Sequence, residues 1–418
     1  MDAADLSPVP ESARTQPPLD LFLIFVAANV VATTMQTGAA LGSRYSGNAA
    51  IGIAMAGAVF GAGLVAILAP VGSRTGLPSM VAARAPLGYR GAQMVSGLLY
   101  LTNFAWIAIN NQIAASAVAQ VAGGPNSARI WAAALGIAAT AVVARGPRAV
   151  GHADRIAVPI MAVAGGVLTY AAFTHAATAE AVALQTPVDG PSVLWGLDVV
   201  IGYQVSWLLM FADYSRYTRS GRAAGTAVLA GLALPALWLL PVGWTLSRIA
   251  GSDDPGAMLA AAGVGWWTAA LIALASVTTN FVNIYLSSLA WRTLVPASSG
   301  KGSVWVIGLL GTSLGLLSTG WLTEFAGLMV MLGSVLVPVG GVFIAHFVLL
   351  KRRIDVLRIY DIAALPAFNA AGMIAWLAGF LVYKTAAPIG ATLPALAASM
   401  IIYVAIRRLR PASEDSSH

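Results

Sequence analysis

Long stretches without any charged side chain are the feature that most constrains this fold. From Gly47 to Pro70 the chain carries no charge, and segments of similar length recur along its whole course. About 20 consecutive apolar residues are enough for a helix to cross the hydrocarbon core of a bilayer. Backbone groups in that core must be satisfied within helices or closed barrels, and segments this long indicate helices. The sequence therefore predicts an all-α integral membrane protein.

The hydropathy pattern predicts about twelve membrane-spanning helices. Composition agrees, because 58% of the 418 residues are hydrophobic and only 9% are charged, whereas soluble domains have roughly 25% charged residues. The predicted spans are 19–41, 47–70, 92–121, 130–144, 156–173, 193–211, 223–247, 265–290, 304–319, 322–350, 362–382 and 389–406. We predict a single transmembrane domain, residues 19–406, between a cytoplasmic N-terminal tail at 1–18 and a cytoplasmic C-terminal tail at 407–418.

Basic residues are distributed unevenly between the two sets of loops. If the N-terminus is cytoplasmic, the inner loops hold 19 Lys and Arg residues and the outer loops hold 4. The positive-inside rule therefore predicts an even number of spans with both termini cytoplasmic, in a bacterial inner membrane. The N-terminal tail lacks a basic segment followed by a short apolar core, so we expect a tail and not a signal peptide. The net charge of +7 is then an orientation signal, which argues against a nucleic-acid partner.

A run of hydroxyl and amide side chains interrupts the eighth predicted span. Residues 275–283 read ASVTTNFVN, and Ser276, Thr279, Asn280 and Asn283 share one face of a helix. An unsatisfied polar group in hydrocarbon costs several kcal/mol, so this stripe must face protein, water or a ligand. A single Thr often bonds a carbonyl of its own helix. A cluster of this size instead indicates a binding site.

The first and sixth spans also contain unusual polarity. Asn29 and Gln36 interrupt the first, and Asp198 and Gln204 interrupt the sixth. Spans five helices apart are expected to correspond when the core consists of two inverted five-helix repeats whose first helices are broken at the bilayer midplane. The repeats are predicted at about 19–177 and 192–350, and two peripheral helices at about 361–406. A broken helix frees backbone carbonyls for a cation and amides for a ligand.

The third span carries an indole between amides. Asn103, Trp106 and Asn110 fall on one helix face at spacings of three and four residues. A planar ring can stack on an indole while flanking amides, which both donate and accept, recognise its edge. A small flat heterocycle would suit Trp106, Trp207, Gln204 and Asn280 together.

Short motifs in a fixed order resemble those of the nucleobase and cation symport family. They include Met35-Gln-Thr-Gly38, Arg74-Thr-Gly-Leu-Pro78, Ala212-Asp-Tyr-Ser-Arg-Tyr217, Thr278-Thr-Asn280, Gly320-Trp-Leu-Thr323 and Val337-Pro-Val-Gly-Gly341. Each motif alone is weakly specific, but the ordered set extends over nearly the whole chain. The resemblance implies a leucine-transporter-like fold with ten core helices in two inverted repeats and two peripheral helices. It also implies secondary active transport.

The resemblance assigns roles to individual residues. It implies that Trp106 stacks on the substrate and that Asn280 bonds its edge, while Asn103 stands where relatives have a glutamine. The implied substrate site consists of Asn103, Trp106, Asn110, Tyr203, Gln204, Ser206, Trp207 and Asn280. The implied Na⁺ ligands are the hydroxyls of Thr278 and Thr279 and the carbonyls of Ala27, Val30 and Ala275.

Two positions depart from the pattern of the family. Relatives carry an aromatic residue one position after Tyr203, where this chain has Gln204, so the second stacking partner is Tyr203 or Trp207. Relatives also have an amide at the place of Ala275, so the cation shell loses one side-chain ligand here.

The sequence thus predicts a symporter that imports a nucleobase-like heterocycle such as cytosine with Na⁺ and without an organic cofactor. A proton is the alternative coupling ion, and hydroxymethylpyrimidine, hydantoin and allantoin are alternative substrates. The oligomeric state is open, and membrane lipid surrounds the protein. An intramembrane enzyme is disfavoured, since the G-x-S-x-G match at Gly311 to Gly315 lies in a predicted membrane helix and not in a strand-turn-helix elbow. A receptor that binds a ligand without moving it is a third class.

Overall fold

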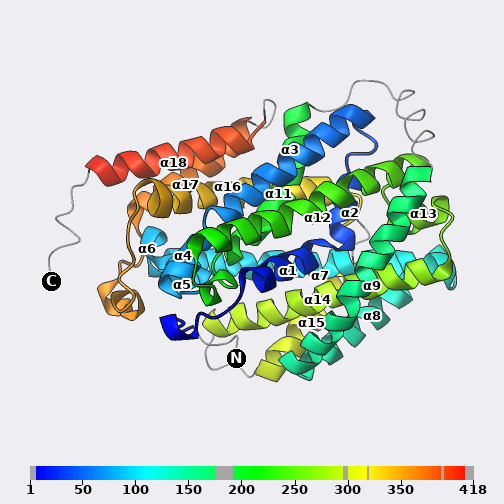
Figure 1. The fold of residues 1–418 in the computed structure, drawn as a ribbon, viewed down its shortest axis with the longest axis horizontal. Helices are drawn as coiled ribbons and strands as arrows, with labels where there is room; N and C mark the ends of the chain where they lie inside the picture. Colours follow the sequence, from blue (N-terminus) through cyan, green and yellow to red (C-terminus); the bar gives the residue numbers. More distant parts are fainter. Residues whose placement is uncertain (1–5, 175–191, 295–299, 318–319, 387–389, 410–418) are drawn as a thin grey trace.

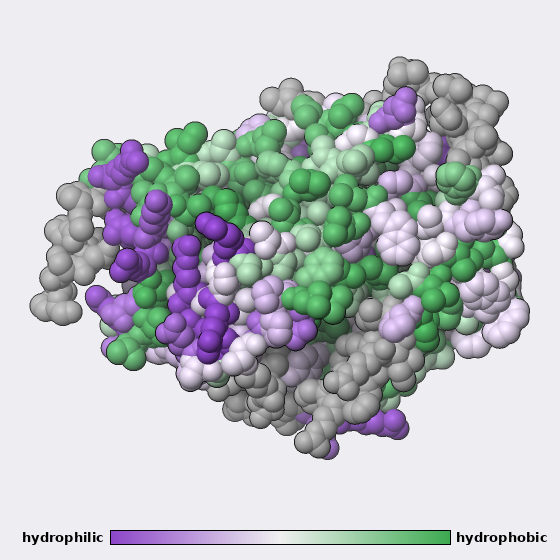
Figure 2. Space-filling view, viewed as in Figure 1, coloured by the Kyte–Doolittle hydropathy of each residue, from purple (hydrophilic) through white to green (hydrophobic). Residues whose placement is uncertain are grey.

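The fold was analysed in a computed structural model, which describes residues 6–174, 192–294, 300–317, 320–386 and 390–409. Every regular element within these ranges is a helix. Figure 1 shows long helices running side by side, with α1 beginning and α18 ending at the same end of the molecule. In Figure 2 hydrophilic residues gather at that end, and hydrophobic residues cover much of the middle. The predicted all-α membrane fold is confirmed.

The described helices match the predicted spans. Seven are long and apolar enough to cross a membrane, one further span is a bent pair, and four shorter apolar helices complete the set. The bounds are α1 Pro18–Asn29, α2 Ala32–Ala39, α3 Gly47–Ala66, α4 Ala69–Thr75, α5 Ser79–Ala82, α6 Arg84–Leu87, α7 Tyr89–Val121, α8 Ala128–Ala144, α9 Pro147–Thr174, α11 Val193–Val205, α12 Gly221–Ala250, α13 Pro255–Ala261, α14 Trp266–Leu294, α15 Gly300–Leu317, α16 Phe325–Ile344, α17 Ala370–Ala386 and α18 Thr392–Leu409. Single helical turns η1 to η7 lie between or extend them. Residues 1–5 and 410–418 of the predicted tails lie outside the described ranges.

The eleventh span begins later than the sequence predicted. The chain forms a 3-10 turn at Ile362–Ala364, and α17 starts only at Ala370. The Asp361 carboxylate accepts the N–H groups of Ala363 and Ala364 and so stabilises the turn. Pro366 then disfavours helical geometry at the residue before it. Apolar residues in this linker had extended the predicted span too far toward the N-terminus.

The first span is broken, as predicted. α1 and α2 meet at an angle of 54°, and Val31 between them is extended, with φ −136° and ψ 159°. The end of a helix leaves its last carbonyls without partners inside the helix. The hydroxyl of Thr34 donates to one of them, the carbonyl of Asn29, at 2.6 Å. The break is therefore held by a hydrogen bond across it.

The sixth span changes its helical geometry instead of bending sharply. α11 ends at Val205, and the chain continues as a 3-10 helix, η3, over Ser206–Met210. The Ser206 hydroxyl donates to the carbonyl of Tyr203 at 2.7 Å, which satisfies a carbonyl at the end of the α-helix. Both first helices of the predicted repeats thus lose regular α-geometry, each in a different way.

The helices pack in two groups. The core bundle consists of α1, α2, α3, α11 and α12, and the scaffold consists of α7, α8, α14 and α15. Glycine lets the bundle pack backbone to backbone. A Cβ placed on Gly243 of α12 would lie 1.9 Å from the carbonyl oxygen of Met35 in α2. Because no side chain fits there, α2 and α12 form one closely packed unit.

The peripheral helices α17 and α18 pack against each other and against α16. The buried carboxylate of Asp198, from α11, accepts the N–H groups of Ala391 at 2.8 Å and Thr392 at 3.0 Å. These N–H groups belong to the start of α18, where a helix has free donors and a partial positive charge. Asp198 therefore caps a helix that is remote from it in the sequence.

Candidate substrate and cation site

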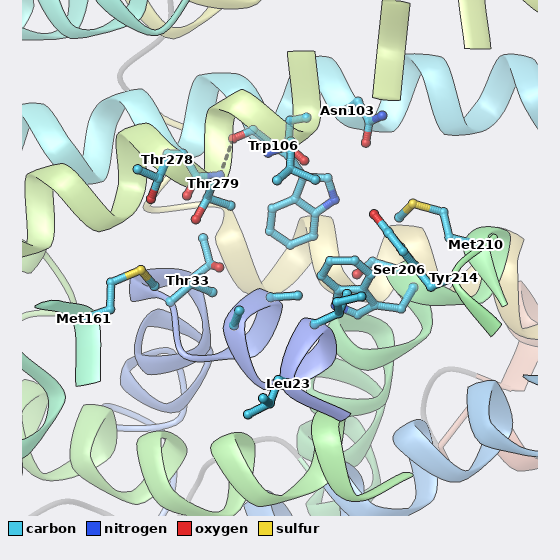
Figure 3. A pocket seen from close by; sticks show the side chains of 18 of the residues that line it. Leu23, Thr33, Asn103, Trp106, Met161, Ser206, Met210, Tyr214, Thr278 and Thr279 are labelled. Atoms are coloured by element: carbon cyan, nitrogen blue, oxygen red, sulfur yellow. Dashed lines mark hydrogen bonds between the residues drawn. The ribbon is translucent and has the colours of Figure 1, made fainter. Parts of the chain in front are cut away.

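A cavity of about 870 Å³ lies between the core bundle and the scaffold. Its wall includes residues of α1 and η3 on the bundle side and of α7 and α14 on the scaffold side. It extends from Val31 at the break in the first span to Gln16 and Asp20 at the beginning of α1. Figure 3 shows Trp106, Ser206, Thr278 and other lining side chains around it. The cavity thus reaches from the middle of the molecule toward the end where the hydrophilic residues gather.

Aromatic side chains from both groups form the inner wall. Trp106 projects from α7 into the cavity (Figure 3), and Tyr203 of α11 meets its ring edge to face at a centroid distance of 6.0 Å. Trp207 of η3 also lines the cavity and contacts Phe25 of α1 at 6.0 Å. The wall therefore offers an indole face from the scaffold and aromatic rings from the broken sixth span.

Two amides flank Trp106 on the same face of α7. Asn103 and Asn110 are both buried and both line the cavity. The Nδ2 of Asn110 donates to the carbonyl of Trp106 at 2.8 Å, so its Oδ1 points elsewhere, and this oxygen has no hydrogen-bond partner. The Nδ2 of Asn103 also has none. Buried polar atoms are rarely left unpaired, so these two atoms are available to a ligand.

Two residues of the predicted substrate site lie outside the cavity wall. Gln204 is fully buried and accepts a hydrogen bond from Asn29 at 3.2 Å. Asn280 donates to Asn111 Oδ1 at 2.8 Å and to the carbonyl of Ile107 at 3.2 Å, which joins α14 to α7. The other six predicted residues, Asn103, Trp106, Asn110, Tyr203, Ser206 and Trp207, line the cavity together.

The cavity also includes residues that the sequence did not single out for substrate contact. Asn283 belongs to the polar stripe of the eighth span, and Thr33 lies in the first span between the polar residues Asn29 and Gln36. Met161 and Pro159 of α9 also line it. No sequence signal marked α9, because its contribution depends on how it packs against α14.

The predicted cation ligands gather beside the break. Thr278, Thr279 and Ala27 line the large cavity, whereas Val30 and Ala275 line a smaller adjoining one of about 30 Å³. The hydroxyls of Thr278 and Thr279 donate to the carbonyl of Ala275 at 2.9 Å and 3.0 Å. Carbonyls of an interrupted helix and hydroxyls of a neighbouring helix are the oxygen ligands expected for a coupling cation. The residues present therefore fit such an ion.

Hydrogen bonds near the start of α13 link it to both groups of helices, and we term this set of contacts the α13 latch. The amide of Gln36 in α2 donates to the carbonyl of Asp253 at 2.8 Å. The hydroxyl of Ser116 in α7 donates to the Asp254 carboxylate, with oxygen distances of 2.8 Å and 3.0 Å, and accepts the N–H of Gly256 at 3.1 Å. Adjacent residues before α13 are thus bonded to the core bundle and to the scaffold.

Residues 8–404 match the family described as "Permease for cytosine/purines, uracil, thiamine, allantoin". The chain belongs to this permease family. The match covers all the helices of the cavity wall, including the segments that carry Trp106, Tyr203 and Thr278. The predicted resemblance to nucleobase and cation symporters is confirmed.

The permease is similar to proteins of known structure and to curated relatives. Cytosine permeases of Escherichia coli strain K12 and of Escherichia coli O157:H7 are 26% identical over 359 residues, covering 83% of this chain and 81% of theirs. Mhp1, a nucleobase-cation-symport-1 family transporter in a closed conformation with bromovinylhydantoin bound, superposes with a TM-score of 0.80 at 18% identity, covering 97% of this chain and 94% of Mhp1. A Na⁺-coupled sialic acid symporter gives 0.64 at 10% identity, covering 96% and 91%. The leucine-transporter-like fold is confirmed.

The hydrolase-like motif of the permease has no elbow geometry. Ser313 lies within α15, a continuous helix from Gly300 to Leu317, and its side chain is exposed. A nucleophile elbow instead requires a sharp turn between a strand and a helix. The pattern is therefore a chance match in a membrane helix, consistent with a family of permeases.

Proposed function

We propose that this permease is a secondary active transporter that carries a small planar heterocycle of the nucleobase type together with Na⁺. The observation that carries the proposal is the indole of Trp106, which faces the cavity between two buried amides with unused hydrogen-bonding atoms. A stacked ring gains contact area and geometric definition from the indole. The flanking amides supply direction, since one offers a donor and the other an acceptor.

The spacing of these amides sets the size of the ligand. Asn103 and Asn110 are two helical turns apart, a rise of about 10 Å. Hydrogen bonds of about 3 Å at each end leave about 4 to 5 Å between the two ligand atoms. A single planar ring with an acceptor on one side and a donor on the other spans such a distance. The arrangement therefore favours a ring with polar substituents over an extended or purely apolar molecule.

Sodium coupling is supported by the position of its proposed ligands. Ala27 and Val30 belong to the end of α1, whereas Ala275, Thr278 and Thr279 belong to α14 in the scaffold. An ion bound between them would hold the broken span of the bundle against the scaffold beside the substrate. Substrate must then raise the affinity for Na⁺ by the same factor by which Na⁺ raises the affinity for substrate.

The proposed location is a bacterial cytoplasmic membrane with both termini on the cytoplasmic side. The support is the excess of Lys and Arg in the loops at the end where α1 begins. In this orientation the cavity extends toward the cytoplasm and the α13 latch closes the outer side. The conformation described here then corresponds to the state that releases substrate inward.

A thermal-shift screen tests this proposal. Purified protein in detergent is heated with cytosine, uracil, purines, hydantoins, allantoin or hydroxymethylpyrimidine, in sodium or in choline at equal ionic strength. We expect one compound to raise the melting temperature only in sodium, because a ligand stabilises the folded state it binds. Trp106→Ala should abolish the shift, and Ser313→Ala should retain it. A shift of equal size in choline would refute sodium coupling, and no shift with any compound would refute the substrate class.

A further inference from the structure

A buried hydrogen-bond network lies directly behind the aromatic wall of the cavity. The Nδ2 of Asn29 donates to Gln204 Oε1 at 3.2 Å and to the carbonyl of Leu232 in α12 at 2.7 Å. The hydroxyl of Tyr203 lies 3.2 Å from Asn29 Oδ1 and 2.6 Å from Thr34 Oγ1. Asn29 and Gln204 are fully buried. The network therefore joins the broken first span, the sixth span and α12 behind one lining residue, Tyr203.

The carbonyl of Leu232 fixes the orientation of the Asn29 amide. A carbonyl oxygen only accepts hydrogen bonds. The Nδ2 of Asn29 must therefore face Leu232, and both of its hydrogens are used by Leu232 and Gln204. The Oδ1 of Asn29 is consequently turned toward Tyr203, whose one hydroxyl hydrogen is shared between this oxygen at 3.2 Å and Thr34 Oγ1 at 2.6 Å. Gln204 keeps the Asn29 amide from turning over, because its own Nε2 also faces Leu232 at 3.4 Å.

Gln204 is packed closely against α3. A Cβ placed on Gly61 of α3 would lie 2.6 Å from the Cβ of Gln204, so the backbone of α3 approaches this side chain closely. The Gln204 side chain instead extends toward Asn29 and the carbonyl of Leu232. The polar residue at 204 thus belongs with Asn29, and Tyr203 provides the ring beside Trp106.

We infer that Asn29 and Gln204 are positioning residues for substrate recognition. They hold the edge of the Tyr203 ring against the Trp106 indole and thereby fix the position of both aromatic side chains in the cavity wall, without touching the substrate. This inference rests on the proposed function, because this part of the wall is taken as the substrate site. It assigns Gln204 an indirect role in place of the direct contact that the sequence predicted. Losing the network should lower affinity and relax discrimination between rings of different shape, with little change in maximal transport rate.

A mutant cycle between positions 204 and 203 tests the inference. Gln204→Leu and Gln204→Met remove the amide and retain similar volume, and Tyr203→Phe removes only the hydroxyl. We expect either change at 204 to weaken binding of the compound selected by the screen about tenfold in the natural background and less than twofold in the Tyr203→Phe background. If the fold-losses in affinity caused by the changes at 204 and 203 simply multiply in the double variant, the inference is overturned, because Gln204 then acts independently of the Tyr203 hydroxyl.

A second readout needs no substrate. The chain has no cysteine, so a cysteine introduced at one position is a single reporter. Thr33 suits this purpose, because it lines the cavity and its hydroxyl lies 3.4 Å from that of Tyr203. Gln204→Met should raise the alkylation rate of Thr33→Cys severalfold, with no further rise when Tyr203→Phe is added. The matched control is Gln112→Met, which removes an amide that bonds the carbonyl of Gly315 away from this cavity. An unchanged rate in Gln204→Met, or an equal rise in Gln112→Met, would overturn the inference even if no heterocycle binds.

Discussion

Ser116→Ala should shift the protein from the conformation described here toward one that is open at the α13 latch. The change removes the hydroxyl that donates to the Asp254 carboxylate and accepts from Gly256. Hydrogen bonds to charged groups contribute roughly 1.5–3 kcal/mol. Since the lost contact links the scaffold to α13 only while the latch is closed, the equilibrium constant between the two states should change by about ten- to a hundredfold.

Cysteine alkylation measures this shift from both ends. Val282 lines the cavity, whereas Thr37 is buried in α2, next to Gln36 of the α13 latch. A cysteine at either position is a reporter. In a Ser116→Ala background, the reporter at Thr37 should react faster by up to the factor estimated above, because it samples the less populated state. The reporter at Val282 should react more slowly, because the cavity that it lines becomes less accessible in the alternative state.

The control for this experiment lies on the same helix. Ser96 is also buried in α7, but its hydroxyl donates only to the carbonyl of Ala92 in its own helix, at 3.0 Å. Ser96→Ala should leave both alkylation rates unchanged. If Ser116→Ala retains the melting temperature of the natural protein and also leaves both rates unchanged, then the latch does not bias the conformational equilibrium.

Three further changes have defined outcomes. Thr279→Val should raise severalfold the Na⁺ concentration at which substrate stabilises the protein. Thr140→Val is the control, because it loses a similar hydrogen bond to its own helix and should leave this concentration unchanged. The same sodium dependence in both variants would contradict the cation assignment. Gly243→Ala should destabilise the folded protein by about 1–3 kcal/mol, because the new methyl group meets the Met35 carbonyl. The methyl group of Gly63→Ala instead lies in open space, so this control should not lower the melting temperature. Asp198→Asn replaces an acceptor with a donor facing a buried N–H, so it should lower the melting temperature and leave substrate affinity unchanged.

The sequence predicted the fold well because membrane insertion imposes strong rules. Apolar length, loop charge and the polar interruption at Asn29 are local properties, and they were sufficient to locate the spans and the break in the first one. The start of α17 was misplaced because an apolar linker before Pro366 has the composition of a helix without its geometry. Composition alone cannot distinguish the two, and most residues of this linker are in fact exposed.

The site was harder to predict because the polarity of a side chain does not show whether it faces the cavity or a neighbouring helix. Trp106, Asn103 and Asn110 share one face of a single helix, and the cavity lies on that face. Gln204 and Asn280 have the same polarity, but their partners, Asn29 and Asn111, belong to other helices and are evident only after packing. The substrate and cation roles of the lining residues stay predictions.

The cap that Asp198 provides has a consequence for assembly in the membrane. Its partners, Ala391 and Thr392, are made long after α11 has been synthesised. Until α18 arrives, Asp198 lacks these donors, and a buried polar group without hydrogen-bond partners is unfavourable. We therefore expect the first ten spans to be less stable alone than with the peripheral pair. A chain truncated before α17 should insert and then be recognised by quality-control proteases.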